Sequence, residues 1–167
     1  IDLKPDFAEA HYNLGNIFKD DGDLKEAEES TRKAIKIKPD FAKAHINLSI
    51  ILIDLGKYKD AEISARNALT IKPDLIKAYL TLFTCLYLLK EFNSALEVIK
   101  NAERIDPKNN DILLFLFIIK GSFSQANNAT NLDTVKNNIF KVKAELKPVI
   151  LARSVEKDLI KTLYKIK

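Results

Sequence analysis

The sequence has few of the residues that stop or cross-link a chain. Its 167 residues include one cysteine, four glycines, five prolines, and neither methionine nor tryptophan. The single cysteine, Cys85, excludes an internal disulfide framework, and its apolar surroundings in YLTLFTCLYLL are typical of a small buried side chain. Because turn-forming residues are scarce, the composition favours helix.

Long apolar runs and dense clusters of one charge are also missing. The longest apolar run, ILLFLFII at 112–119, is far shorter than the roughly 20 residues that a membrane-spanning helix needs. The 27 basic and 23 acidic residues are interspersed, without the basic patch that nucleic-acid binders show. No secretory signal opens the chain. We therefore expect a cytoplasmic protein that neither inserts into a membrane nor binds nucleic acid.

What the sequence does contain is a repeat. Prolines stand at positions 5, 39, 73 and 107, which are three successive steps of 34 residues. KPDFAEAH at 4–11 returns as KPDFAKAH at 38–45, and LKEA, YKDA and FNSA recur at the same interval. A fixed period over three units indicates an array of similar units rather than one compact core.

Each unit has the pattern of two amphipathic helices separated by a break. In the first unit the apolar and small residues step by three and four, first as Ala8, His11, Leu14, Gly15 and Phe18, and then, after Gly22, as Leu24, Ala27, Thr31 and Ala34. One hairpin cannot bury both stripes alone, so neighbouring hairpins must stack. The pattern predicts an all-α fold, a right-handed α-α superhelix (solenoid) of stacked antiparallel helical hairpins.

The period also predicts how the chain is divided. After Pro107 the next proline is Pro148, so the fourth unit is longer than the others. IDLKP at 1–5 matches IKIKP at 35–39, and with no methionine present the chain is expected to be a piece of a longer protein. The expected segments are the end of a preceding truncated repeat at 1–4, repeats at 5–38, 39–72 and 73–106, a degenerate fourth repeat at 107–147 with an enlarged loop at about 121–130, and a capping helix at 148–167.

Residues 5–106 resemble the tetratricopeptide repeat. That family has a 34-residue antiparallel helix pair, with an aromatic residue, Leu and Gly on the first helix, Ala and a bulky residue on the second, and a closing Pro. The third unit departs from this pattern twice. Phe83 occupies the slot of Gly15 and Ser49, where it is expected to disturb the hairpin, and Lys90 replaces a turn glycine. A lysine in a left-handed turn costs about 1 kcal/mol.

The resemblance implies a scaffold that binds a protein or peptide. In such arrays the first helices line a concave groove, and the residues beside their buried stripes are the expected contacts with an extended segment. These are Tyr12, Asn13, Asn16, Lys43, Ile46, Asn47, Ile50, Lys77, Leu80, Thr81 and Thr84.

Two versions of this binding follow from more specific resemblances. AHYNLGNIFKD and AHINLS are similar to the repeats of O-GlcNAc transferases, which implies that Asn13 and Asn47 hold a peptide backbone, with Thr81 interrupting the ladder. Other members of the family clamp the C-terminal carboxylate of Hsp70 or Hsp90. The five slots of that clamp fall on Tyr12, Asn16, Asn47, Lys77 and Thr81, and Lys77 is the only one of the three expected cations.

The residues that could perform chemistry do not converge. The two histidines, His11 and His45, stand one period apart, which is about 10 Å in a stacked array and too far for one metal or one dyad. We therefore expect no catalytic, cofactor-binding or metal-binding residues in this segment. Three further expectations remain. The chain is either a scaffold by itself or the docking arm of an enzyme whose glycosyltransferase, sulfotransferase or iron/2-oxoglutarate oxygenase domain lies outside it. Self-association through the exposed first hairpin is a third alternative.

Overall fold

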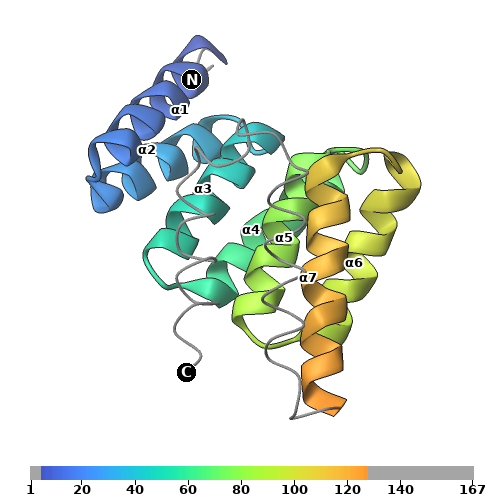
Figure 1. Cartoon of the computed structure of the whole chain (residues 1–167). Coiled ribbons are helices and arrows are strands. Elements are labelled where there is room, and N and C mark those ends of the chain that lie inside the picture. The colour runs from blue at the N-terminus through green and yellow to red at the C-terminus, as the bar shows by residue number, and fades with distance from the viewer. Residues whose placement is uncertain (1–4, 128–167) are drawn as a thin grey trace. The chain divides into compact units, whose positions relative to one another are not determined.

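The computed structural model of the chain describes residues 5–127, which form helices and contain no strand (Figure 1). The helices are α1 (Pro5–Asp21), α2 (Leu24–Ile37), α3 (Ala42–Asp54), α4 (Tyr58–Ile71), α5 (Ile76–Leu88), α6 (Phe92–Ile105) and α7 (Asn110–Asn127). The all-α fold predicted from the repeat is confirmed. None of these helices is long and apolar enough to span a membrane.

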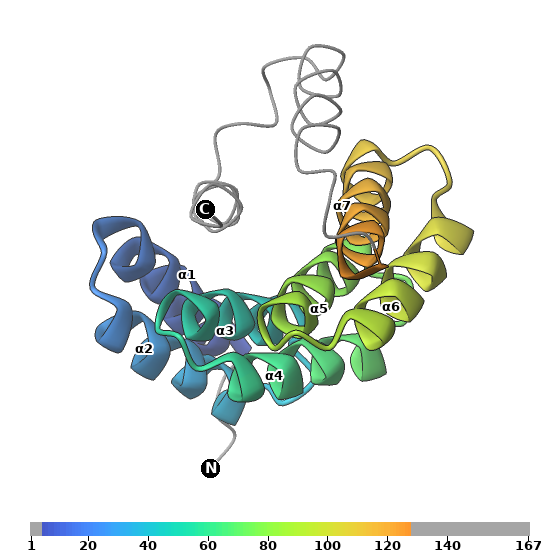
Figure 2. The same ribbon diagram turned by 60° about the horizontal axis from the view of Figure 1, so that its bottom comes forward.

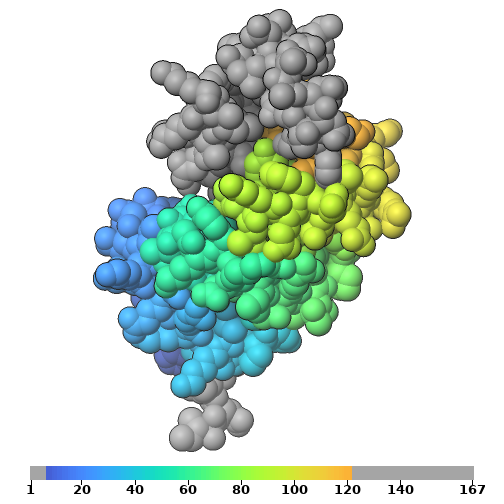
Figure 3. All heavy atoms as spheres, turned by 90° about the horizontal axis from the view of Figure 1, so that it is seen from below, coloured from blue at the N-terminus to red at the C-terminus, as the bar shows by residue number. Residues whose placement is uncertain are grey.

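Three antiparallel hairpins, α1–α2, α3–α4 and α5–α6, stack in chain order in a compact unit that ends at Lys120. Each second helix also packs on the first helix of the next hairpin, α2 on α3 and α4 on α5. Figure 2 shows the first helices in one layer and the second helices in another. Neighbouring first helices contact one another more than neighbouring second helices do, so the first-helix layer lies on the inner side. Figure 3 shows the successive units filling space against each other.

Alanine at two repeated slots of the second helices lets the helices approach closely. Every one of these alanines is fully buried, namely Ala27, Ala61 and Ala95 at the first slot and Ala34, Ala68 and Ala102 at the second. A methyl group fills a close helix contact without separating the backbones, and interiors tolerate few voids. The hairpins therefore stack with a regular spacing.

Each hairpin turn uses a residue in the left-handed conformation, at Gly22 (φ 91°), Gly56 (φ 74°) and Lys90 (φ 63°). The backbone N–H of the next residue donates to a carbonyl near the end of the first helix, from Asp23 to Phe18, from Lys57 to Leu52 and from Glu91 to Leu86, each at 2.8 Å. This is the hydrogen bond of a Schellman motif, which favours glycine at the left-handed position. The left-handed lysine expected in the third unit is confirmed.

The slot of Gly15 shows how one position accepts residues of different size. A Cβ atom on Gly15 would overlap Oγ1 of Thr31 and lie 3.3 Å from the carbonyl oxygen of Ala27. In the second unit the slot holds Ser49, whose Oγ donates to the carbonyl of Ala61 at 2.7 Å. Space for it exists because the slot of Thr31 is there taken by a smaller alanine.

Phe83, in the same slot of the third unit, is fully buried, and α5 contacts α6 less extensively than α3, a helix of the same length, contacts α4. Its ring stacks on Phe115 of α7 with 4.6 Å between centroids, and on Tyr87 with 5.8 Å. Ala95 and Ala102 of α6 are still fully buried beneath it. The ring therefore joins the third hairpin to α7.

The loop predicted at about 121–130 is wrong over residues 121–127, because α7 continues through them to Asn127. A single glycine inside a helix costs only about 1 kcal/mol, which the flanking turns overcome. The remainder of that loop, the second helix of the fourth repeat, the capping helix at 148–167, and residues 1–4 lie outside the described residues.

The strained turn in the third unit predicts that Lys90→Gly raises the free energy of unfolding by about 1 kcal/mol, because glycine adopts positive φ without a Cβ clash. Gly56→Lys, at the equivalent slot, should lower it by a similar amount. Urea unfolding of the three chains measures both changes. A Lys90→Gly chain that is no more stable than the parent would contradict the assignment of strain to this turn.

The close contact at Gly15 predicts that Gly15→Ala destabilises the chain by about 1–3 kcal/mol through overpacking, despite the better helix propensity of alanine. Thr31→Ala in the same chain should restore most of the loss, because it removes the hydroxyl that the new methyl group would meet and leaves the alanine that the second unit has at this slot. Thermal unfolding of the single and double variants is the measurement. Additive losses would show that Thr31 is not the obstacle.

Candidate functional site

The residues predicted to line the groove all lie on α1, α3 and α5, whose shared layer we call the inner surface. Their exposure differs. Asn13, Lys43 and Lys77 are exposed, Tyr12, Asn16, Ile50 and Leu80 are half-buried, and Ile46, Asn47, Thr81 and Thr84 are buried. The exposed and half-buried residues are thus available for contact, whereas the buried ones form the base of the inner surface.

The buried polar residues of the inner surface already have partners within the fold. Asn47 Nδ2 donates to Oγ1 of Thr31 on α2, with 3.4 Å between the two atoms. The hydroxyls of Thr81 and Thr84 donate to carbonyls one turn earlier in α5, at 2.8 and 3.0 Å. Of the two asparagines in the predicted ladder, only Asn13 has an exposed side chain.

The inner surface changes in chemistry along the stack. On α1 it presents amide side chains and the ring of Tyr12, which packs on Phe41 at 5.1 Å between centroids. On α3 it becomes aliphatic, with Ile46 buried against Ala68 and Ala78, and Ile50 packed on the same cluster. Exposed Lys43 stands in the first turn of α3, and the equivalent slot of α5 holds Lys77. Polar, apolar and cationic groups thus lie on one layer.

The five slots of the carboxylate clamp do not present the groups that such a clamp requires. The ring of Tyr12 packs on Phe41, the Thr81 hydroxyl is bonded to its own helix, and Asn47 is directed to Thr31. A carboxylate is held most strongly by several charged donors, and Lys77 is the only cation among these slots.

A second surface, which the sequence analysis did not predict, lies on the opposite side of the first two hairpins. Here α2 and α4 border a depression of about 440 Å³ whose lining includes His45 and Leu48 of α3. His45 is 8% exposed, and its Nε2 donates to the carbonyl of Pro39 at 2.9 Å, so this histidine is a bonded core residue. One residue in the sequence could have pointed to this depression. Ile63 on α4 is apolar where the equivalent slot of α6 holds Glu97, and its side chain is 58% exposed.

Ion pairs formed by residues on the second helices or just before them join successive units. Lys57 pairs with Glu28 at 2.8 Å, and Lys59 pairs with Glu91 at 2.6 Å. Burial opposes ionisation of Glu28, but hydrogen bonds from Lys57 and Arg32 outweigh that effect and lower the pKa of its carboxyl group. Each pair therefore helps to fix one hairpin against the next, although such exposed pairs contribute only about 0.2–1 kcal/mol.

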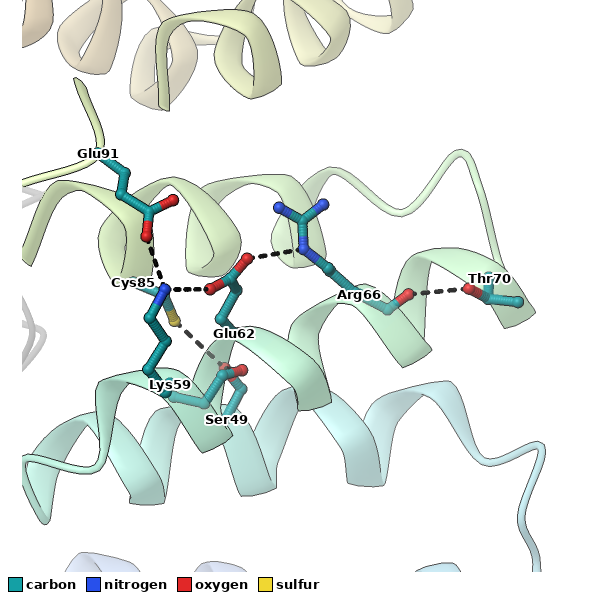
Figure 4. A network of polar contacts seen from close by, with 8 residues as sticks. Ser49, Lys59, Glu62, Arg66, Thr70, Cys85 and Glu91 are labelled. Carbon is teal, nitrogen blue, oxygen red and sulfur yellow. Dashed lines mark hydrogen bonds and ion pairs between the residues drawn. The ribbon is translucent and has the colours of Figure 1, made fainter. Parts of the chain in front are cut away.

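Cys85 is fully buried. Figure 4 draws its contact with Ser49 together with the ion pairs of Lys59, Glu62, Arg66 and Glu91. Its Sγ lies 3.7 Å from Oγ of Ser49. Burial raises the pKa of the thiol to about 11, while the hydrogen bond to Ser49 acts in the opposite direction. A thiol of this kind is not a nucleophile at neutral pH, and the interpretation of Cys85 as a buried core side chain is confirmed. Among the described residues, no group of three or more histidines, cysteines or acids could hold a metal ion.

Comparison with known families identifies the repeating unit. Residues 8–41 and residues 42–75 each match a family model of the tetratricopeptide repeat. These two segments are therefore tetratricopeptide repeats, and α5 and α6 form a third hairpin of the same architecture. No curated protein sequence matches the chain at a significant level.

Solved structures of low sequence identity share the fold. The first tetratricopeptide domain of Spaghetti (RPAP3), bound to the HSP90 peptide SRMEEVD, is 19% identical with a TM-score of 0.70, over 74% of this chain and 98% of that one. The second such domain of human RPAP3, in complex with the HSP70 peptide SGPTIEEVD, is 23% identical with a TM-score of 0.67, over 70% and 98%. The TPR2B domain of yeast Sti1, in its complex with pHsp70, is 23% identical with a TM-score of 0.65, over 69% of this chain and 97% of that one.

The raised pKa of Cys85 predicts a loss of stability in alkali. Because the unfolded thiol ionises near pH 9 and the folded one near pH 11, the folded state retains a proton that the unfolded state has lost. The free energy of unfolding should therefore fall as the pH rises from about 9 to about 11. Urea unfolding across this window should show a steeper fall for the parent than for Cys85→Ala, in which lysines and tyrosines titrate unchanged. Parallel curves would show that the thiol is not the cause.

Proposed function

We propose that this chain is a scaffold that binds a segment of another protein on its inner surface. The observation that carries the proposal is the stack itself, in which three adjacent first helices present side chains at slots 34 residues apart. Repetition of this kind makes a long surface that fits an extended chain. The structures that share the fold include two that hold a bound peptide, which supports a peptide as the class of ligand.

The residues available on the inner surface indicate the composition of the partner. Ile50 and Leu80 are half-buried and aliphatic, so they favour apolar side chains of the ligand. Exposed Lys43 favours an acidic residue next to that apolar portion. Asn13 and Asn16, further along the stack, can donate to and accept from a peptide backbone. The proposed ligand is therefore an extended segment with aliphatic residues flanked by acid.

This ligand differs from a free chaperone tail. The SRMEEVD and SGPTIEEVD peptides belong to the similar structures, whereas here two of the three cationic slots of a carboxylate clamp hold Tyr12 and Thr81. Affinity for a terminal carboxylate depends on such cations. We therefore place the main contacts on the aliphatic portion of the inner surface rather than on the clamp slots.

The more specific expectations from the sequence remain predictions. The asparagine ladder of O-GlcNAc-transferase-like repeats would rest on Asn13, because Asn47 is buried against Thr31. A docking arm for an enzyme domain outside this chain would bind its segment on the same inner surface. The bound segment would then be the substrate of that enzyme domain. A cytoplasmic location likewise remains a prediction.

The proposal predicts which single changes abolish binding. Random twelve-residue peptides displayed on phage and selected on the parent chain should be rich in aliphatic and acidic residues. Ile50→Asp should weaken the selected peptides about tenfold or more, because it places a charge in the apolar portion, which corresponds to about 1.4 kcal/mol. Lys43→Glu should reverse the preference for acid. Fluorescence anisotropy with synthetic copies of the peptides measures each affinity.

The matched control is Ile63→Asp, a change of the same chemistry on the outer face of α4. It should leave the affinity of the selected peptides unchanged, and circular dichroism should show equal helicity in all variants. Peptides that lose binding with Ile63→Asp but keep it with Ile50→Asp would place the binding site on the outer depression and refute the inner surface.

A further inference from the structure

The depression between α2 and α4 has the build of a protein contact site. Neighbouring second helices contact one another less than neighbouring first helices do, so α2 and α4 diverge on the outer side of the stack. Ile35 of α2 and Leu48 of α3 make its base apolar, and charged and amide side chains stand around it. Its volume of about 440 Å³ is large enough to receive side chains of another molecule.

Ile63, on the α4 wall of this depression, is apolar at a slot that the fold does not require to be apolar. The same slot holds Glu29 on α2 and Glu97 on α6, and both glutamates are exposed. The side chain of Ile63 is nevertheless 58% exposed. A large apolar side chain that rims a depression without contributing to the core is typical of a surface that contacts another molecule.

The depression is a feature of these two units and not of the repeat in general. Thirty-four residues further on, Tyr79 stands in place of His45, and Val98 stands in place of Ser64. Both replacements are larger, and both lie on the equivalent junction of α4, α5 and α6. The space between α2 and α4 therefore follows from the small side chains that this junction alone contains.

The two walls of the depression carry opposite charge. On α2, Arg32 and Lys36 are one helical turn apart, and Lys36 forms no ion pair with any described residue. Arg32 shares the carboxylate of Glu28 with Lys57, so these three side chains together keep one positive charge. On α4, Asp60 is exposed and likewise has no ion pair within the described part of the chain.

We propose that this depression is a docking site for an amphipathic helix of a partner protein. The apolar side chains of that helix enter the depression over Ile35, Leu48 and Ile63. An acidic residue on one flank lies against α2, and a basic residue on the other flank lies against Asp60. Both walls are helices, whose side chains line the depression at steps of three and four, and a groove between two helices accepts the ridge of a third.

A second copy of this chain fits the site less well than a separate helix does. The depression lies on the outer side of the curved stack (Figure 2), so two copies placed back to back would touch over a narrow strip. A stable interface buries roughly 1,200–2,000 Å² in total. A single helix avoids this difficulty because it lies within the groove.

The inference goes beyond the proposed function and does not depend on it. The inner surface is formed by the first helices and this depression mainly by the second helices, so both sites can be occupied at once. The chain would then hold two partners together.

The test uses a phage library of a three-helix bundle in which one helix face is randomised, selected on the full chain without counter-selection. Most independent binders should carry apolar residues flanked by acid. Ile63→Glu should weaken them about tenfold in biolayer interferometry. The variant should keep its fold, because the slot already holds Glu29 and Glu97 in the other units. Circular dichroism checks its helicity.

Two further variants separate docking from a general effect. Ser64→Val introduces the residue of the equivalent slot in α6 and should also weaken the binders, because it narrows the depression. The matched control is Ile105→Glu, which alters another exposed isoleucine of the second-helix layer and should leave the affinity unchanged. Lys36→Glu should weaken the binders about threefold, and changing the facing acid of the binder to lysine should restore the affinity.

Four results would overturn the proposal. Most binders could keep their affinity for the Ile63→Glu and Ser64→Val chains, or lose it equally with Ile105→Glu. Light scattering could reveal a dimer that Ile63→Glu dissociates, which would make a second copy the occupant. Recovery of no helical binder, with twelve-residue peptides that Ile63→Glu weakens, would make the occupant an extended segment. The inner surface is tested separately with Ile50→Asp, so either proposal can fail while the other stands.

Discussion

The whole stack depends on close contact between helices at the repeated alanines. Because every one of these methyl groups is fully buried, the distance between one helix and the next is set by a residue that has no freedom to adjust. The same alanine slots recur in each unit, and the first helices lie in one layer where they present equivalent slots side by side. The layout of the inner surface is thus a consequence of how the backbones pack.

Between these fixed contacts the structure tolerates large changes. The slot of residues 15, 49 and 83 holds glycine, serine and phenylalanine in successive units. Glycine leaves room for the Thr31 hydroxyl, the serine hydroxyl donates to a backbone carbonyl, and the phenylalanine ring stacks on Phe115. The left-handed lysine at position 90 is accepted because the hydrogen bond of the hairpin turn is kept. The third unit therefore retains its hairpin while its contacts shift toward α7.

The candidate binding residues could be placed on the correct helices from the sequence, because a 34-residue period and a helical stripe determine which slots share a layer. Their accessibility could not be predicted in the same way. Asn13 and Asn47 have the same slot and nearly the same local sequence, yet one is exposed and the other is buried with its amide on Thr31. The exposure of a side chain that faces a neighbouring hairpin depends on the residues of that hairpin, and the local sequence does not contain them.

The sequence by itself determined the helices, their pairing and the order of the stack, since stripe spacing, turn glycines and the repeated alanines are all local features. Only the tertiary structure decided that α7 runs on through Gly121, that Phe83 joins α5 to α7, and that Leu14 is open while Leu48 is closed. Each of these outcomes depends on what lies across an interface. Burial depends on both surfaces of an interface, whereas the sequence of one repeat describes only one of the two surfaces.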